Sequence, residues 1–281
     1  MALTLNVGAG QSKRAKIVVI TGEPGVGKTG LCLAAEKPFF VTFDPGNDWH
    51  NGKMFKTEQG TALIPHTVDD AFEMLAWCTK KANIEENEIK TVVVDSLSQF
   101  QNLVYADIVL KHPVYTEHKE QKPTKSITDL GYDGRGYAMD YFNRIIAFGE
   151  RMKERGVNVI FITHSEKVKA VTDSNNDVKV WDIGLQIYGQ HNVAALFKKQ
   201  ADFVYHLYAE RTGTTKGAGM FQKTSAEGQS TSQVIVQTRE TSLRYAKTRA
   251  IDESSIPDFY MMDSTNRAEI CAEIFKQIKE N

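Results

Sequence analysis

Three features that often reveal the class of a protein are scarce in this chain: cysteine, long apolar runs and an excess of charge of one sign. The three cysteines, Cys32, Cys78 and Cys271, are odd in number and widely spaced. This pattern predicts neither a disulfide framework nor a zinc site. Cys32 and Cys78 instead suit positions in a hydrophobic core, where free cysteine behaves as a small apolar residue.

No stretch of the chain approaches the length that spans a membrane. Residues 1–15 also lack the apolar run of a secretory signal peptide. We therefore expect a cytoplasmic protein with no membrane partner. The 34 basic and 35 acidic residues leave a net charge of −1. That balance excludes a general attraction to nucleic acid, so any contact with DNA has to come from a local patch.

Glycine is placed where it matters most, in residues 22–29, which read Gly-Glu-Pro-Gly-Val-Gly-Lys-Thr. They match the phosphate-binding loop G-x-x-x-x-G-K-[ST]. Residues 16–21 before the loop are β-branched and apolar, as in a buried parallel strand, and residues 29–35 after it can open a helix. A strand, a glycine loop and a helix in this order predict a nucleotide site rather than a glycine-rich turn.

The backbone of the loop explains the chemistry. Glycines allow the chain to wrap closely around an anion, and the N–H groups at the start of the next helix can converge on phosphate oxygens. Lys28 supplies a point charge for the β- and γ-phosphates, and the Thr29 hydroxyl can bind Mg²⁺. The predicted nucleotide-binding residues are Gly22, Glu23, Pro24, Gly25, Val26, Gly27, Lys28, Thr29 and Gly30.

Alternating strand and helix patterns predict one large α/β domain with a mostly parallel sheet and antiparallel strands toward the C-terminus. Helices are expected at 67–82, at 97–111, from Ala138 to near Gly156, and at 265–279, and a long polar loop at 112–135. The predicted strands are 38–43, 91–96, 157–163, 201–208 and 232–237, and residues 242–250 are expected to pair with the last of these.

Ligands of such sheets bind at the carboxyl ends of the strands. The loop, Asp44, Asp95 and His164 all fall at these ends. Asp95 can hold Mg²⁺ opposite Thr29, although an aspartate at this place can also cap the next helix. The expected ligands are therefore ATP and Mg²⁺, with Thr29 and Asp95 on the metal.

Four segments in order, VVITGEPGVGKT, FFVTFDPGND, TVVVDSLSQF and VIFITHSE, resemble the RecA-like P-loop ATPase core. The closest resemblance is to phage-encoded RecA-type proteins that assist single-strand annealing and recombination, and it covers roughly residues 15–250. It implies subunit assembly into a ring or filament, single-stranded DNA as partner, a single-strand-binding protein as a further partner, and host cytoplasm as location. It also implies a flexible segment at 1–14, an ATPase core at 15–255, and a C-terminal tail and helix at 256–281 packed on the core.

The resemblance assigns roles to single residues. RecA-like proteins usually carry Asp-x-Glu after the second strand to orient the attacking water, but here Gly46 stands in the place of the glutamate. Asp44, Asp48 or Glu23 then takes that role, or hydrolysis is slow. His164 stands where the family has a polar sensor of the γ-phosphate, unless a backbone carbonyl simply satisfies it.

Lys247 and Arg249 resemble a Lys-x-Arg element that crosses a subunit interface in RecA-like assemblies. There it stabilises charge on the γ-phosphate bound by the neighbour, which makes hydrolysis depend on assembly. Without the resemblance, the same residues read equally well as a solvated basic strand end.

The segment 166–200 takes the place of a DNA-binding loop in the resemblance. Cations for phosphates and aromatic rings for bases are the ingredients of single-strand binding. The candidate DNA-binding residues are Lys167, Lys169, Lys179, Trp181, Lys198 and Lys199. Trp181 fits the core of a small hairpin equally well. The polar loop at 112–135, with its lysines, is a second candidate.

Two functions of different class follow. In the first, the protein is a slow, Mg²⁺-dependent ATPase that acts on single-stranded DNA in phage recombination, annealing or replication. In the second, it is a nucleotide-dependent regulator or loader that binds a protein partner and no DNA. A small-molecule kinase is a weaker third reading, since no acceptor pocket or arginine-rich lid is evident and Lys247 and Arg249 would have no role.

Overall fold

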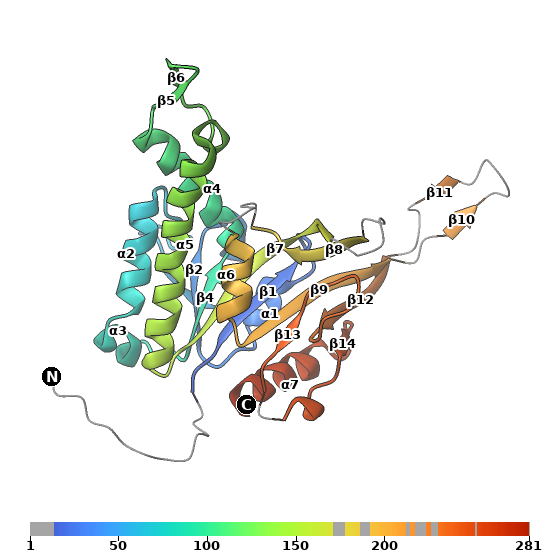
Figure 1. Cartoon of the computed structure of the whole chain (residues 1–281). Helices are drawn as coiled ribbons and strands as arrows, with labels where there is room; N and C mark the ends of the chain where they lie inside the picture. The colour runs from blue at the N-terminus through green and yellow to red at the C-terminus, as the bar shows by residue number, and fades with distance from the viewer. Residues whose placement is uncertain are drawn as a thin grey trace, which may run out of the picture.

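A computed structural model describes residues 14–170, 178–185, 192–211, 214–216, 223–225, 230–250 and 252–280 of the chain. Its centre is a sheet of mostly parallel strands with helices on both faces (Figure 1). Antiparallel strands β12 (Ser230–Gln237) and β14 (Phe259–Met262) extend the sheet beyond β9. The predicted α/β class is thus confirmed. The parallel strands are, in spatial order, β9 (Phe203–Arg211), β1 (Ile17–Gly22), β7 (Asn158–Ala170), β4 (Thr91–Asp95), β2 (Pro38–Thr42) and β3 (Lys53–Met54).

The sheet is apolar along its central strands because both of its faces are covered. All six residues of β1 are buried. Ile17 and Val19 belong to one hydrophobic core, whereas Val18 and Ile20 belong to the other. Side chains that alternate between two covered faces give the continuous apolar runs typical of parallel strands.

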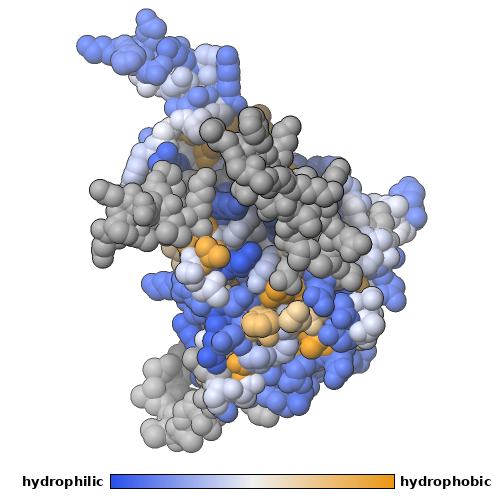
Figure 2. Space-filling view, turned by 90° about the vertical axis from the view of Figure 1, so that its right-hand side faces the viewer, coloured by the Kyte–Doolittle hydropathy of each residue, from blue (hydrophilic) through white to orange (hydrophobic). Residues whose placement is uncertain are grey.

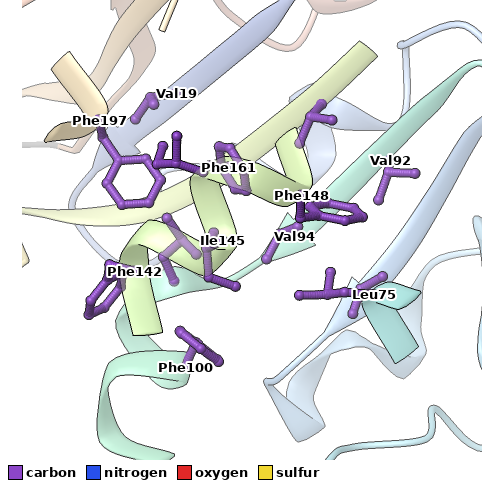
Figure 3. Close-up of a cluster of buried hydrophobic side chains, with 14 of the residues drawn as sticks. Val19, Leu75, Val92, Val94, Phe100, Phe142, Ile145, Phe148, Phe161 and Phe197 are labelled. Atoms are coloured by element: carbon purple, nitrogen blue, oxygen red, sulfur yellow. The ribbon is translucent and has the colours of Figure 1, made fainter. Parts of the chain in front are cut away.

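The larger core lies under α2 (Val68–Cys78), α4 (Leu97–Lys111), α5 (Gly131–Glu154) and α6 (Val193–Gln200). Figure 3 shows its side chains, in which aromatic rings of α4, α5 and α6 gather over β7 and β4. The rings of Phe161 and Phe197 meet edge to face with centroids 5.3 Å apart, a favoured geometry for aromatic pairs. The smaller core lies under α1 (Lys28–Cys32) and α7 (Arg267–Glu280).

Three predictions of local structure were wrong. Residues 112–135 are not one loop: they form the hairpin β5 (Val114–Glu117) and β6 (Glu120–Pro123), the 3₁₀ turn η2 (Ile127–Leu130) and the start of α5. The helix expected at 67–82 ends at Cys78, and α3 (Lys81–Glu86) follows. Strand β13 (Lys247–Thr248) pairs with β9 and not with β12.

The expected strand at 157–163 is longer than predicted. It continues as β7 to Ala170 and pairs there with β8 (Val178–Ile183) in an antiparallel hairpin. A third hairpin, β10 (Thr214–Lys216) with β11 (Lys223–Ser225), lies beyond the ends of β9 and β12 (Figure 1).

The C-terminal segment closes the sheet at one edge. β14 pairs with β12, and α7 places Cys271, Ile274 and Ile278 in the smaller core. Short 3₁₀ turns lie at Pro45–Trp49 (η1) and Glu253–Ser255 (η4). Among the helices in the described parts of the chain, none has the length and apolar character needed to cross a membrane.

Candidate nucleotide-binding site

The predicted site residues converge at the carboxyl edge of the parallel strands. Gly22, the last residue of β1, lies in register with His164 on β7 and with Leu207 on β9. On the other side of β7, Asp95 ends β4 in register with Thr42, two residues before Asp44. These residues are far apart in the sequence. They lie close together because the carboxyl ends of parallel strands meet at one edge of the sheet.

The glycines of the loop meet two different requirements. Gly27 has φ of 90°, in the left-handed region that glycine adopts without strain. Gly22 is needed for close approach, because a Cβ there would overlap the backbone oxygen of Leu207. The loop therefore lies tightly against β9 before it turns into α1.

The Lys28 side chain is buried and hydrogen-bonded to the backbone of the loop. Its ammonium donates to the carbonyl oxygens of Gly22 (2.9 Å) and Glu23 (2.8 Å), and the residue is only 7% exposed. Burial lowers the pKa of Lys28 to about 8, against the opposing effect of Asp95. A cation that is removed from water and lacks full compensation is stabilised by an anion, so the loop fits a phosphate group.

Thr29 and Asp95, the two residues expected to hold Mg²⁺, lie in direct contact. The Thr29 hydroxyl donates to Asp95 Oδ2 at 2.6 Å, and Asp95 is 5% exposed. The cap of α4 is Ser96, whose side chain accepts from the Gln99 N–H, so Asp95 is not the capping residue. A hydroxyl and a carboxylate beside a phosphate loop suit Mg²⁺, which usually takes few protein ligands and completes its shell with phosphate and water.

His164 and Asp44 flank the same edge. Burial, and then the nearby Lys28, lower the pKa of the His164 imidazole, while Asp44 opposes them. The ring is therefore neutral at pH 7. The backbone oxygen of His164 accepts from the Thr21 hydroxyl (3.1 Å) and the Gly184 N–H (2.7 Å). Asp44 accepts from the Gly46 N–H at 2.9 Å and so caps η1.

Lys247 and Arg249 lie at the opposite end of the sheet from the loop. β13 pairs with β9 at Phe203 and Val204, whereas the loop leaves β1 opposite Leu207. The Lys247 ammonium donates to backbone oxygens at the end of α6 and just beyond it, to Lys198 at 2.7 Å and to Ala201 at 2.6 Å. Arg249 is more open: its side chain is 62% exposed and lies 3.9 Å from Asp202.

The residues predicted to contact DNA are only partly brought together. Lys167 lies over the ring of Trp181, 4.8 Å from its centroid, on the β7–β8 hairpin. Lys198 forms an ion pair with Asp182, and Lys199 is exposed on α6. Lys169 and Lys179 are paired in that hairpin, but their side chains lie outside the described part of the structure. In the second candidate region, Lys122 is paired with Glu117.

One cavity beside the loop was not predicted from the sequence. Its volume is about 220 Å³, and the Arg244 guanidinium lies over the Tyr208 ring at 3.6 Å. Burial, followed by Arg244, lowers the pKa of His206 to about 4, so this histidine is neutral. The cavity connects the phosphate loop with the candidate DNA hairpin, since its walls are Glu23, Trp181, His206, Tyr208, Ala209 and Arg244.

Two further residues beside the loop were also missed. Arg267, at the start of α7, donates to the Gly27 oxygen at 3.4 Å. Trp49, at the end of η1, is 64% exposed and lies next to Gly30. Gly30 was the one sequence feature that could have indicated these neighbours. Glycine within a helix costs roughly 1 kcal/mol relative to alanine and usually has a packing or functional reason.

Comparison with known proteins identifies the family of this chain. The model of a family described as AAA domain matches residues 14–250. No curated protein matches the chain. Among solved structures, the KaiC-like protein PH0186 from the hyperthermophilic archaeon Pyrococcus horikoshii OT3 is similar over 84% of this chain and 82% of that chain, with 12% identity and a TM-score of 0.38.

A structural likeness at that level carries no argument about fold or function. The family match is different, because it spans the phosphate loop, Asp95, His164 and every parallel strand of the sheet. The chain therefore belongs to the AAA domain family of P-loop ATPases.

Proposed function

We propose that this protein is a RecA-like, Mg²⁺-dependent ATPase that acts on single-stranded DNA in phage recombination, annealing or replication. The observation that carries the ATPase part is the buried arrangement of Lys28 with the Thr29–Asp95 pair. ATP would supply the anion that stabilises the Lys28 charge, and Mg²⁺ bound with it would neutralise phosphate charge beside Asp95.

Hydrolysis is expected to be slow. Gly46 stands where the family has its glutamate, and Asp44 is already engaged with the Gly46 N–H. Glu23 and His164 remain at the same edge of the sheet, and neutral His164 can accept or donate a hydrogen bond near the γ-phosphate. A water molecule that is poorly oriented for attack gives a low turnover number without any loss of ATP affinity.

In this proposal, self-association brings Arg249 of one subunit to the phosphate site of another. Arg249 is exposed but lies at the far end of the sheet from its own loop, so it can serve only the site of another subunit. Figure 2, which views the side of the molecule with the C-terminal strands, shows a small apolar patch among hydrophilic residues. On edge strand β14, Phe259 and Met261 are 48% and 41% exposed, which suits a surface that becomes covered on assembly.

DNA binding is supported by the β7–β8 hairpin. Lys167 and Trp181 pair a cation with an aromatic ring there, and Trp181 shares the 220 Å³ cavity with Glu23 of the phosphate loop. DNA bound on this hairpin is therefore expected to affect the loop through the residues that line this cavity.

The alternative is a nucleotide-dependent regulator or loader that binds protein and no DNA. It is favoured by the ion pairs that other lysines of the candidate DNA-binding regions form with carboxylates. Lys198 is paired with Asp182, and Lys122 with Glu117. These pairs, together with the net charge of −1, reduce the positive charge available to phosphates.

The deciding experiment measures binding of a single-stranded oligonucleotide at low and high salt, with and without ATP. The proposal expects tight, salt-sensitive binding at low salt and an ATPase rate that DNA increases. Lys167→Ala should weaken binding, whereas Lys81→Ala, at an exposed site on α3, should not. No binding at low salt would leave the regulator or loader as the better reading.

A further inference from the structure

Arg267 reaches the phosphate loop from the C-terminal segment of the chain. Its Nη2 donates to the Gly27 oxygen at 3.4 Å. A Cβ at Gly27 would overlap this nitrogen, and one at Gly30 would lie 3.2 Å from it. The two glycines thus leave a space beside the loop that the guanidinium fills, although the two segments lie 240 residues apart in sequence.

Trp49 approaches the same glycine from another element. Its Cη2 atom would lie 3.9 Å from a Cβ at Gly30. The side chain is 64% exposed, and its only described ring contact is edge-to-face with His50, at 5.3 Å between centroids. An indole that is left open beside a phosphate loop offers a flat surface to a ligand.

The directions in which the residues of α1 point indicate which part of a bound nucleotide Arg267 and Trp49 would contact. Successive residues of α1 point about 100° apart, so the flank of Gly30 differs from that of Thr29, which faces Asp95. Lys28 and Thr29 mark the end of the site that holds the β- and γ-phosphates. The flank with Gly27 and Gly30 is then left for the α-phosphate and the nucleoside.

We propose that Arg267 and Trp49 form the nucleoside side of the nucleotide site. The Arg267 guanidinium hydrogen-bonds an α-phosphate oxygen, and the Trp49 indole stacks on the nucleobase. This inference rests on the proposed nucleotide site and adds to it a direct link from α7 to nucleotide occupancy. Arginine suits the role because its planar fork of donors matches phosphate oxygens.

The test compares ATP with inorganic triphosphate, which has the phosphates but no nucleoside, by isothermal titration calorimetry. Trp49→Ala should weaken ATP binding about tenfold, as expected for the loss of one stacked base, and leave triphosphate binding unchanged. Arg267→Gln should weaken both ligands about tenfold, and Arg267→Lys less. The matched controls are Leu110→Ala and Lys276→Gln, two exposed sites that should bind both ligands like the wild type.

A fluorescence measurement gives a second readout. The chain has three tryptophans, and Trp77 is packed against Phe39 and Phe55. ATP should change the emission of a Trp77→Phe, Trp181→Phe double variant, in which only Trp49 remains, and leave unaltered that of a Trp49→Phe, Trp181→Phe double variant, in which only the packed Trp77 remains. The unfolding midpoint of each nucleotide-free variant shows whether it is folded.

The two possible failures are distinguishable. If the wild type binds neither ATP nor triphosphate, the proposed function itself is wrong. If the wild type binds ATP and Lys28→Ala does not, but Trp49→Ala and Arg267→Gln both bind like the wild type, then only the nucleoside-side assignment is overturned.

Discussion

Replacing Lys28 with methionine should stabilise the nucleotide-free protein while it abolishes ATP binding. Burial lowers the pKa of Lys28 from 10.5 to about 8, which corresponds to an unfavourable free energy of about 3 kcal/mol for the charged form in the folded state. Loss of the two hydrogen bonds to Gly22 and Glu23 returns about 2 kcal/mol of this. The net expectation at pH 7 is a gain of about 1 kcal/mol, or an unfolding midpoint about 3 °C higher.

The dependence of the free energy of unfolding on pH provides a second test of this prediction. Between pH 8 and pH 10.5 the unfolded chain binds the Lys28 proton and the folded chain does not, so the stability of the wild type rises with pH through this window. At pH 10 most of the penalty has gone, and the advantage of Lys28→Met should have largely disappeared. Thermal unfolding followed by circular dichroism at pH 7 and pH 10 measures both quantities.

Added ATP provides the functional half of the experiment. At a hundred times its dissociation constant, ATP should stabilise the wild type by about 2.7 kcal/mol and leave Lys28→Met unchanged. Lys81→Met, at a side chain that is 80% exposed, serves as the control and should stay within about 0.5 kcal/mol of the wild type. The reasoning is refuted if Lys28→Met is less stable than the wild type at pH 7, or if its advantage is the same at both pH values.

Three further predictions concern the frame of the site. Gly22→Ala should lower the free energy of unfolding by more than 2 kcal/mol, because the new Cβ overlaps the Leu207 oxygen; a midpoint close to that of the wild type would contradict this. Asp202→Ala should cost about 3 kcal/mol in denaturant titration, since Asp202 accepts from the Ile17 N–H and pairs with Lys153; Asp252→Ala, on an exposed turn, is the control. Arg249→Ala and Lys28→Ala should each lose ATPase activity and regain part of it when mixed, as steady-state rates will show; no recovery on mixing would exclude catalysis between subunits.

The order of the main elements could be predicted because each has a local signal. β1 and β4 are buried on both faces and therefore have continuous apolar sequences, and Ser96, directly after β4, caps α4. The hairpin of β5 and β6 had no such signal: its strands have four residues each and none of these residues is buried, so no alternation of apolar and polar residues marked them. The pairing of β13 with β9 depends on a contact between distant segments, which local sequence patterns do not encode.

The sequence by itself determined the phosphate-binding part of the nucleotide site. Residues 22–29 specify their chemistry by glycine placement and by two side chains, and they do so locally, because a strand, a loop and a helix follow one another directly. Only the tertiary structure decided which distant residues serve that loop. It placed the Lys247 ammonium at the end of α6, left Arg249 at the far end of the sheet, and brought Arg267 to Gly27. The physical reason is that the order of strands in the sheet, with β1 between β7 and β9, is fixed by long-range packing, and no short segment of the chain contains that information.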